Sequence, residues 1–255
     1  MHDLSGKTIL VTGASKGIGA ATVRQLGACG AFVVSHYSSD RNGAEEACKD
    51  IAIPKKLLVE ANFEDLDQVE ALWDTAMGWR GRIDVLVNNA AIMLWDGGFE
   101  ETLDAWDTAW EKTLRVNVLA PARLLRRAVK YFKEENGGIV ITLSSWAAQK
   151  GVTNPSTIAY GSSKAAIQAA TQTIARAFAK DGILAYVIAP GVVRTRLSDQ
   201  FAATQGGADN ISSALAMGEW VPPEELAELI TYLARGRARH LSGATLDVNG
   251  ASYIR

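Results

Sequence analysis

Short runs of apolar residues alternate with longer amphipathic segments along almost the whole chain, and this alternation restricts the fold more than any other feature. Most of the short runs are aliphatic or β-branched at every position, which is typical of strands covered on both faces of a parallel sheet. Strands are expected at Thr8–Val11, Ala31–His36, Lys56–Glu60, Val85–Asn88, Gly138–Leu143, Ile183–Ile188 and Thr245–Val248. Helices are expected at Gly17–Leu26, Ala44–Ile51, Leu66–Trp79, Trp106–Phe132, Ala159–Ala179 and Glu224–Leu233. The alternation predicts an α/β protein with three layers, a doubly wound parallel sheet between two layers of helices.

The charge balance and the cysteine content exclude several classes of protein. The 255 residues include 26 Lys and Arg against 28 Asp and Glu, and this near-neutral balance argues against binding to nucleic acid or to an anionic membrane surface. Two cysteines and three widely spaced histidines form neither a disulfide framework nor a metal-ligand cluster, so no metal is expected. No apolar run approaches the roughly 18 residues that span a bilayer, and no signal peptide is recognisable. We therefore expect residues 1–255 to form a single-domain cytoplasmic enzyme or binding protein.

Residues 196–220 interrupt the alternation. This segment contains Gly206-Gly207 and shows only weak periodicity. A long irregular insertion in a compact α/β domain is more often a lid or a binding loop than an accident, so we expect a substrate lid here. The alternative is a solvent-exposed pair of short helices.

Three glycines follow the first predicted strand and open the first predicted helix: Gly13, Gly17 and Gly19. Glycine allows the backbone to turn tightly and to approach a diphosphate, while a helix N-terminus offers free N–H groups and a positive dipole. The spacing differs from both the common dinucleotide-binding pattern and the P-loop. Its position after the first strand favours nucleotide binding, and tight strand–helix packing is the alternative.

Tyr160 and Lys164 are four residues apart on a predicted helix, so an ammonium group can lie near a phenol. A nearby cation favours phenolate and lowers a tyrosine pKa from its usual value of about 10, which suits general acid–base catalysis. Without context, such a pair is more often an ordinary helix contact. Ser145 supplies the context, because it ends a predicted strand at the sheet edge where ligands bind.

Asn117 lies among Val116, Val118 and Leu119 inside a long predicted amphipathic helix. Its surroundings alone favour a hydrogen-bonded core amide over a site residue.

In this order the motifs resemble the short-chain dehydrogenase/reductase family, close to its ketoacyl-reductase-like and its sugar- or polyol-dehydrogenase-like members. The resemblance extends from Lys7 to Gly250. It includes Thr12–Gly19, Asn88-Asn89-Ala90, Asn117, Ser145, Tyr160 with Lys164, Pro190–Thr195 and Leu246–Gly250. It implies a Rossmann-type domain and an oxidoreductase that moves a hydride between a nicotinamide cofactor and a small ketone or aldehyde and its secondary alcohol.

The resemblance also implies a role for each catalytic residue. Tyr160 would exchange a proton with the substrate oxygen, and Lys164 would lower its pKa and hold the nicotinamide ribose. Ser145 would hydrogen-bond the substrate oxygen, and Asn117 would hold a water that relays protons to solvent. Thr195 and the backbone of Val193 would fix the nicotinamide carboxamide. The implied cofactor contacts are Gly13, Ser15, Lys16, Gly17, Ile18, Gly19, Tyr37, Ser38, Ser39, Arg41, Asn62, Phe63, Asn89, Ala90, Tyr160, Lys164, Pro190, Gly191, Val193 and Thr195.

Three positions depart from the family's pattern without removing a catalytic group. Ala91 replaces a usual glycine, so the local packing around the cofactor is expected to shift slightly. Asn62 replaces the usual acid that reads the adenine amino group, and its amide oxygen can still accept that hydrogen bond. Tyr186 replaces a usual asparagine and has no assigned role.

The end of the second predicted strand indicates the cofactor preference. Tyr37 occupies the position where an NAD-selective site places a carboxylate for the ribose hydroxyls. The side chains able to surround a 2′-phosphate are those of Lys16, Ser38, Ser39 and Arg41. We therefore expect a preference for NADP(H), with NAD(H) as the alternative if Asp40 reaches the ribose.

Trp95, Trp146 and Trp220 stand beside the segments expected to form the site. They favour a pocket for an apolar, aromatic or ring-shaped carbonyl compound, and packing in the core or at subunit contacts is the alternative. The helices expected at Trp106–Phe132 and Ala159–Ala179 resemble the family's subunit-contact helices, which implies a homotetramer or homodimer. Two rival functions are a non-catalytic dinucleotide-binding redox sensor and an NAD-dependent alcohol or polyol dehydrogenase of the same fold. The complete catalytic set argues against the sensor.

Overall fold

Seven parallel strands form one sheet in this computed structural model, which describes residues 3–204 and 206–255. The strands are β1 (Thr8–Val11), β2 (Phe32–Tyr37), β3 (Lys56–Glu60), β4 (Val85–Asn88), β5 (Gly138–Leu143), β6 (Ile183–Pro190) and β7 (Thr245–Val248). Their order across the sheet is β3-β2-β1-β4-β5-β6-β7, and every neighbouring pair is parallel. The predicted doubly wound α/β fold is therefore confirmed.

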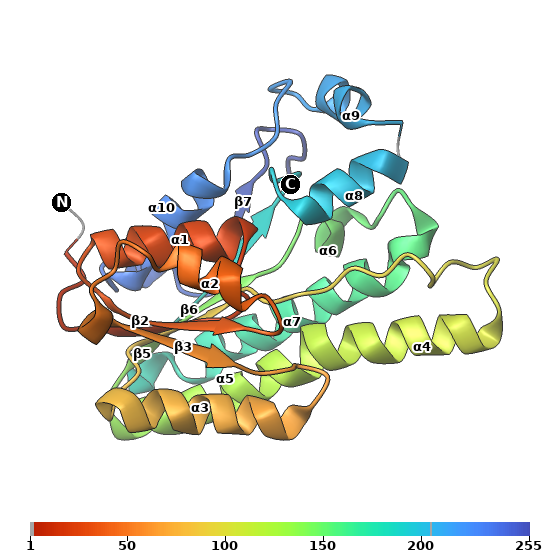
Figure 1. Cartoon of the computed structure of the whole chain (residues 1–255). Helices are drawn as coiled ribbons and strands as arrows, with labels where there is room; N and C mark the ends of the chain where they lie inside the picture. Colours follow the sequence, from red (N-terminus) through yellow and green to blue (C-terminus); the bar gives the residue numbers. More distant parts are fainter. Residues whose placement is uncertain (1–2, 205) are drawn as a thin grey trace.

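Successive residues of the strands face opposite layers of helices. In β1, Ile9 and Val11 pack into one apolar core, while Leu10 between them packs into the other. The first core is covered by α1 (Gly17–Ala28), α2 (Arg41–Ala47) and α10 (Pro223–Ala234), and the second by α3 (Leu66–Arg80), α5 (Ala120–Glu134) and α7 (Ile158–Ala177) (Figure 1). This two-sided burial is the reason that the strands are apolar at every position rather than at alternate positions.

The direction in which successive strands are added to the sheet reverses between β1 and β4, because β2 and β3 extend the sheet on one side of β1 and β4 pairs on the other. Ligands of open α/β sheets bind in the crevice that such a switch point creates. Two loops are joined there by hydrogen bonds. The backbone amides of Asn89 and Ala90 each donate to Thr12 Oγ1 at 3.0 Å, and Asn89 Nδ2 donates to the carbonyl of Thr12 at 2.8 Å and that of Gly13 at 3.0 Å.

The single long helix expected at Trp106–Phe132 is interrupted. It consists of α4 (Leu103–Leu114), a π-helix η2 (Arg115–Leu119) and α5, and the Ala120 amide donates to the Arg115 carbonyl five residues earlier. Pro121 explains the wider turn, because it lacks the N–H that would bond the Asn117 carbonyl in an α-helix. Short π-helical segments of this kind are often found at functional sites.

Several other element boundaries differ by a few residues from those expected, and two of these differences have a clear structural cause. Helix α2 begins at Arg41 rather than Ala44, because the Asp40 carboxylate accepts the Gly43 amide at 2.9 Å and caps the helix there. Strand β6 continues to Pro190, because its last two residues pair with β7.

Residues 196–220 fold as α8 (Arg196–Thr204) and α9 (Ala208–Ala214), beyond the two helical layers (Figure 1). The expectation of an irregular backbone is therefore wrong. The segment has the secondary structure of the alternative, a pair of short helices. The segment is not fully exposed, however, because Ala202 and Trp220 are buried. Gln205, which the expected lid includes, lies outside the described residues.

Tyr186, which had no assigned role, lies fully buried in β6, and its hydroxyl donates to the Ala238 carbonyl at 3.0 Å. The remaining short elements are α6 (Ala147–Lys150) and 3₁₀ turns at Ile53–Lys55, Pro155–Thr157, Ala179–Asp181 and Arg239–Leu241. Within the described residues, no helix has both the length and the apolar character needed to cross a membrane.

Candidate active site

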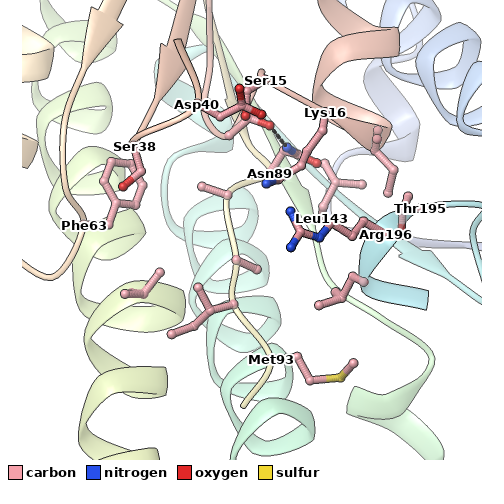
Figure 2. Close-up of a pocket in the computed structure, with 18 of the residues that line it drawn as sticks. Ser15, Lys16, Ser38, Asp40, Phe63, Asn89, Met93, Leu143, Thr195 and Arg196 are labelled. Atoms are coloured by element: carbon pink, nitrogen blue, oxygen red, sulfur yellow. Dashed lines mark hydrogen bonds between the residues drawn. The ribbon is translucent and has the colours of Figure 1, made fainter. Parts of the chain in front are cut away.

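A pocket of about 560 Å³ lies at the carboxyl ends of the strands around the switch point (Figure 2). Figure 2 shows Ser38 and Phe63 on one side of this pocket and Thr195 and Arg196 on the opposite side. The expected cofactor contacts that line it are Gly13, Ser15, Lys16, Gly17, Ile18, Ser38, Ser39, Asn62, Phe63, Asn89, Ala90, Tyr160, Lys164 and Thr195. Residues separated by up to 187 positions in the chain are thus brought to one pocket, Gly13 being at one extreme and Gln200 at the other.

Six expected cofactor contacts do not line the described pocket: Gly19, Tyr37, Arg41, Pro190, Gly191 and Val193. Tyr37 is directed into the protein and is only 3% exposed. Arg41 lies on the surface of α2, where its guanidinium pairs with Glu45 at 2.8 Å. The structure therefore does not bring the Tyr37 and Arg41 side chains to a bound 2′-phosphate.

Val193 takes part in an isolated β-bridge with Val221. The bridge uses the carbonyl of Val192, which accepts from Val221 at 2.9 Å, and the amide of Arg194, which donates to Val221 at 3.0 Å. It therefore leaves out the N–H and carbonyl of Val193 itself, the groups expected to contact the carboxamide.

The turn between β1 and α1 requires glycine for steric reasons. Gly13 and Gly17 have φ angles of +65° and +54°, in the region that favours glycine. A methyl group on Gly19 would lie 2.1 Å from the carbonyl oxygen of Gly13, and one on Gly17 would lie 2.9 Å from the Thr195 side chain. The space around Gly17 and Gly19 has no room for a side chain. The turn therefore stays tight enough for a diphosphate to approach the start of α1. The residues present therefore fit a dinucleotide.

Ser145, Tyr160 and Lys164 converge where β5 ends beside α7. The Ser145 side chain hydrogen-bonds the Tyr160 side chain, and its oxygen also accepts the Ala147 amide at 3.1 Å. Lys164 is 5% exposed, and its Nζ lies 5.8 Å from the Tyr160 ring centroid. The ammonium donates to the Leu143 carbonyl at 2.8 Å, which fixes the lysine at the end of β5.

Burial dominates the electrostatics of these two residues. It lowers the pKa of Lys164 to about 8, because the charged ammonium loses its hydration. It also raises the pKa of Tyr160, while the hydrogen bond from Ser145 acts in the opposite direction. The expectation that Lys164 lowers the pKa of Tyr160 is not met in this geometry, since the ammonium is bound to the Leu143 carbonyl and burial has the larger effect.

Asn117 is buried in the π-helix η2, and its side chain is fully hydrogen-bonded. Its Oδ1 accepts from the Ile92 amide at 2.8 Å, and its Nδ2 donates to the Ile92 carbonyl at 2.8 Å and to Ser163 Oγ at 3.0 Å. The side chain thus joins η2 to the loop after β4 and to α7, as the core-amide interpretation predicts. Its backbone carbonyl has no α-helical donor, because Pro121 four residues later lacks an N–H.

Ala91, which replaces a usual glycine, lines the pocket with an ordinary backbone conformation, because its φ is not positive. The methyl group therefore needs no strained backbone at this position.

Sequence reasoning missed several residues that line the pocket. The loop after β4 contributes Ile92, Met93 and Leu94, and α8 contributes Arg196, Leu197 and Gln200. Arg196 is the first residue of α8, where a cation is unfavourable beside the positive end of the helix dipole. It forms no ion pair with a described residue. The sequence signal that could have identified Arg196 is its position directly after the Pro190–Thr195 motif, where a cation begins a helix.

The three singled-out tryptophans contact the α8–α9 segment (residues 196–220) or, like Trp220, end it, and none of them lines the described pocket. Trp95 stacks on Phe201 of α8, with ring centroids 6.2 Å apart. Trp220 is buried with Val192 and Ala202, and Trp146 packs against the same cluster. The tryptophans therefore form an apolar base that supports α8 and α9.

Among residues 3–204 and 206–255, no group of three or more His, Cys, Asp or Glu side chains is arranged to hold a metal ion.

Comparisons with known proteins agree with this geometry. Residues 13–251 match a family model described as enoyl-(acyl carrier protein) reductase. The chain is 34% identical to 3β-hydroxysteroid dehydrogenase 1 of Eggerthella lenta, across 99% of this chain and 95% of that protein.

Two solved structures share the fold over nearly their full lengths. A gluconate 5-dehydrogenase from Beutenbergia cavernae, assigned as NAD(P)-dependent and containing NADP, has a TM-score of 0.88 and 29% identity, covering 98% of each chain. The 3-ketoacyl-(acyl-carrier-protein) reductase from Brucella melitensis in complex with NADH has a TM-score of 0.87 and 26% identity, covering 99% of this chain and 100% of that one. The chain therefore belongs to the short-chain dehydrogenase/reductase family and is an NAD(P)-dependent oxidoreductase that acts on alcohol and ketone groups.

Proposed function

We propose that this protein interconverts a ketone or aldehyde and its alcohol with NADP(H) as the preferred cofactor, and that Ser145, Tyr160, Lys164 and Asn117 carry the proton transfer. The observation that carries the proposal is the hydrogen-bonded pair of Ser145 and Tyr160 beside the buried Lys164, at the end of β5. These groups share the sheet edge with the glycine turn, where the residues fit a dinucleotide.

In the direction of reduction, the phenol of Tyr160 donates a proton to the substrate oxygen, and the Ser145 hydroxyl hydrogen-bonds the same oxygen. The Ser145 hydroxyl is already hydrogen-bonded to Tyr160, so both donors are held together before a substrate arrives. When bound, the nicotinamide cofactor supplies or accepts the hydride.

Lys164 restores the proton of Tyr160 and directs its ammonium toward the ribose. A lysine with a pKa of about 8 exchanges a proton readily near neutral pH, whereas an ordinary lysine stays protonated. The Asn117 carbonyl holds a water at the open turn of η2, and this water connects Lys164 to solvent.

Cofactor preference depends on the groups near the end of β2. Lys16, Ser38 and Ser39 line the pocket and offer one cation and two hydroxyls to a 2′-phosphate. Asp40 also lines the pocket, but its Oδ1 accepts the Gly43 amide and so caps α2. Lys16, Ser38 and Ser39 therefore favour NADP(H), although Tyr37 and Arg41 do not contribute as expected. Arg196 on the opposite side adds a cation for the diphosphate, which NADP(H) and NAD(H) share.

The substrate is an apolar or ring-shaped carbonyl compound that enters beneath the α8–α9 segment, which acts as its lid. Met93 and Leu94 line the pocket, and Trp95 contacts Phe201 on the lid. Trp146 and Trp220 support the lid from the apolar cluster at its base. The relative that acts on steroids by name is consistent with such a substrate.

The active form is a homodimer or homotetramer. Apolar side chains at the start of α4 are unusually exposed, with Phe99 67% and Leu103 72% accessible. Ala166 and Ala169 are exposed on α7, where small side chains allow another helix to approach closely. Size-exclusion chromatography with light scattering gives a dimer or tetramer mass if this is correct, and a monomer mass contradicts it.

A panel of ketones, aldehydes and alcohols, followed at the nicotinamide absorbance with NADPH and NADH in parallel, tests the function. We expect turnover of an apolar cyclic ketone and a higher kcat/KM with NADPH. A clear NADH preference contradicts the cofactor assignment. A product in which only a carbon–carbon double bond is reduced contradicts the assigned reaction.

Tyr160→Phe is the decisive variant. It removes the proton donor and should lower kcat by about 10²- to 10⁴-fold, the usual contribution of general acid catalysis. NADPH affinity should stay within about twofold, since the ring and Lys164 remain. Unchanged turnover in this variant would refute the mechanism and favour another proton donor.

A further inference from the structure

His36 lies in β2, two residues before Ser38, and is buried with only 2% of its surface exposed. His36 is one of the residues that line the pocket. Its ring stacks on Phe63, with centroids 4.3 Å apart and planes 12° from parallel. A buried imidazole in a strand between two apolar cores needs hydrogen-bond partners, because an unpaired polar group there is costly.

Both ring nitrogens are used, and together they determine the tautomer. The backbone N–H of Gly13 donates to Nδ1 at 3.0 Å, so Nδ1 carries no hydrogen. The hydrogen is therefore on Nε2, which donates to the carbonyl of Ala61 at 2.9 Å. Burial lowers the pKa of His36 to about 4, so the ring stays neutral and keeps this pattern at neutral pH.

The two partners of His36 belong to two loops that face the pocket. Gly13 begins the glycine turn, where its backbone has a φ of +65°. Ala61 is the first residue after β3 and is followed directly by Asn62 and Phe63, which line the pocket on the side of Ser38. The imidazole thus links the turn after β1 to the loop after β3, and its face also supports the ring of Phe63.

We propose that His36 is a positioning residue for the adenosine half of the cofactor, because it fixes the glycine turn and the Asn62–Phe63 loop at one separation. This inference rests on the proposed function, since it requires a dinucleotide in this pocket. His36 acts through Gly13, Ala61 and Phe63, and it lies on the adenosine side, away from Ser145 and Tyr160 at the end of β5.

Other residues preserve only part of this link. Phenylalanine keeps a ring against Phe63 but offers neither an acceptor for the Gly13 amide nor a donor for the Ala61 carbonyl. Asparagine offers an oxygen that can accept from Gly13, but it lacks the ring and its amide is too short to replace Nε2. The expected order of cofactor affinity is therefore histidine, then asparagine, then phenylalanine.

The test measures binding of the two halves of the cofactor separately. Titration calorimetry of the full chain is carried out with NADPH, with adenosine 2′,5′-bisphosphate as the adenosine fragment, and with reduced nicotinamide mononucleotide as the other fragment. For His36→Phe we expect Kd to rise about tenfold for NADPH and for the adenosine fragment, since one or two buried hydrogen bonds are lost. The Kd for the mononucleotide and kcat at saturating NADPH should stay within about twofold.

Ser35→Ala is the matched control, because Ser35 is the neighbouring buried polar residue of β2 and its hydroxyl interacts with Cys48 rather than with either loop that His36 links. It should leave all three Kd values unchanged. If His36→Phe does not fold, His36→Asn is used instead. We then expect a higher Kd for the adenosine fragment and an unchanged Kd for the mononucleotide.

If the substitution weakens binding of both fragments equally, or weakens binding of neither, the proposed role of His36 is overturned. Failure of the wild-type protein itself to bind NADPH is a different result, because it contradicts the proposed function and not the assignment of His36.

Discussion

The nucleotide end of the pocket and the α8–α9 segment face each other but are stabilised differently. The nucleotide end is formed by turns that follow adjacent strands, and hydrogen bonds between side chains and backbone connect them through Thr12, Asn89 and His36. The described residues of the α8–α9 segment form no comparable set of hydrogen bonds to the strands. It is held by the Val193–Val221 bridge at its base, by the apolar cluster around Trp220 and by stacking of Trp95 on Phe201.

This difference matches the different tasks of the two regions. A dinucleotide has a fixed shape, and a network of short directional bonds holds its site in one geometry. Substrates must enter and leave, and segments that move are held by few buried contacts. We therefore expect damage at the nucleotide end to affect every substrate, and damage at the α8–α9 segment to affect substrate binding selectively.

The largest effect should come from Gly19→Ala, which tests how rigid the nucleotide end is. The new methyl group would lie 2.1 Å from the Gly13 carbonyl, and backbone cannot move aside as a flexible side chain can. We expect kcat/KM for NADPH to fall by about 100-fold, the size of effect that a displacement of about 1 Å can cause. Steady-state kinetics with varied NADPH measure it.

Gly78→Ala is the control for this prediction. Gly78 lies inside α3 with no atom within 4 Å of the added methyl group, so alanine should raise the free energy of unfolding by about 0.5–1 kcal/mol. Near-normal kinetics of Gly19→Ala would show that the turn is not rigid and would remove the contrast between the two regions.

Trp220→Ala tests the α8–α9 segment. Removal of this buried ring should cost about 3 kcal/mol of local stability, since large-to-small changes at buried aromatic residues typically cost this much. Limited proteolysis within residues 196–220 should become faster and KM for the carbonyl substrate should rise, while Kd for NADPH should stay within about twofold. Met217→Ala, at a residue that is 64% exposed in the same segment, should change none of these. A loss of NADPH affinity as large as the change in KM would show that the two regions are coupled.

Acid should weaken the nucleotide end through His36. Its pKa is about 4 in the folded chain and about 6.5 when unfolded, so between these values the unfolded chain binds more protons and stability falls as pH falls. The contribution of His36 to the free energy of unfolding should decrease by about 2 kcal/mol between pH 7 and pH 5. Urea denaturation of wild type and His36→Asn at both pH values isolates the contribution of His36, because the titrating carboxylates are the same in both proteins. Equal pH dependence in the two proteins would contradict the buried neutral imidazole.

The smallest effect is expected for Asp40→Ala, at the edge of the nucleotide end. Loss of the α2 cap should cost about 1 kcal/mol of stability, and the ratio of kcat/KM for NADPH to that for NADH should stay within about twofold. Thermal unfolding and parallel kinetics with both cofactors measure these changes. Selective loss of NADH turnover would mean that Asp40 contacts the ribose rather than only capping the helix.

Local pattern was enough for the sheet and the glycine turn. Strands such as β1 and β5 are apolar on both faces, and a central parallel strand is the structure that buries both. Gly13 and Gly17 adopt φ angles that their residue type permits, so the position of the turn was readable too. The catalytic set was recognised from a family resemblance of ordered motifs, and no spacing alone would have selected it.

Properties that depend on distant neighbours were not readable. Tyr37 was expected at the cofactor because of its position in the motif, but its side chain is buried and does not line the pocket. The expected effect of Lys164 on Tyr160 was based on spacing, whereas burial and the Leu143 carbonyl determine the pKa of the lysine. The helices of residues 196–220 were not predicted, because they are short and pack against one small cluster rather than against the sheet.

The sequence by itself determined the doubly wound sheet, the glycine turn and the residue types available for hydride-transfer chemistry. Those features depend on backbone conformation and local periodicity, which neighbouring residues specify. Only the tertiary structure decided that His36 joins two loops, that Asp40 caps α2 and that Arg196 faces the pocket. Each of these depends on which atoms lie within about 3 Å of one another, or on which residues line the same pocket, after folding. Residues up to 187 positions apart come together only then.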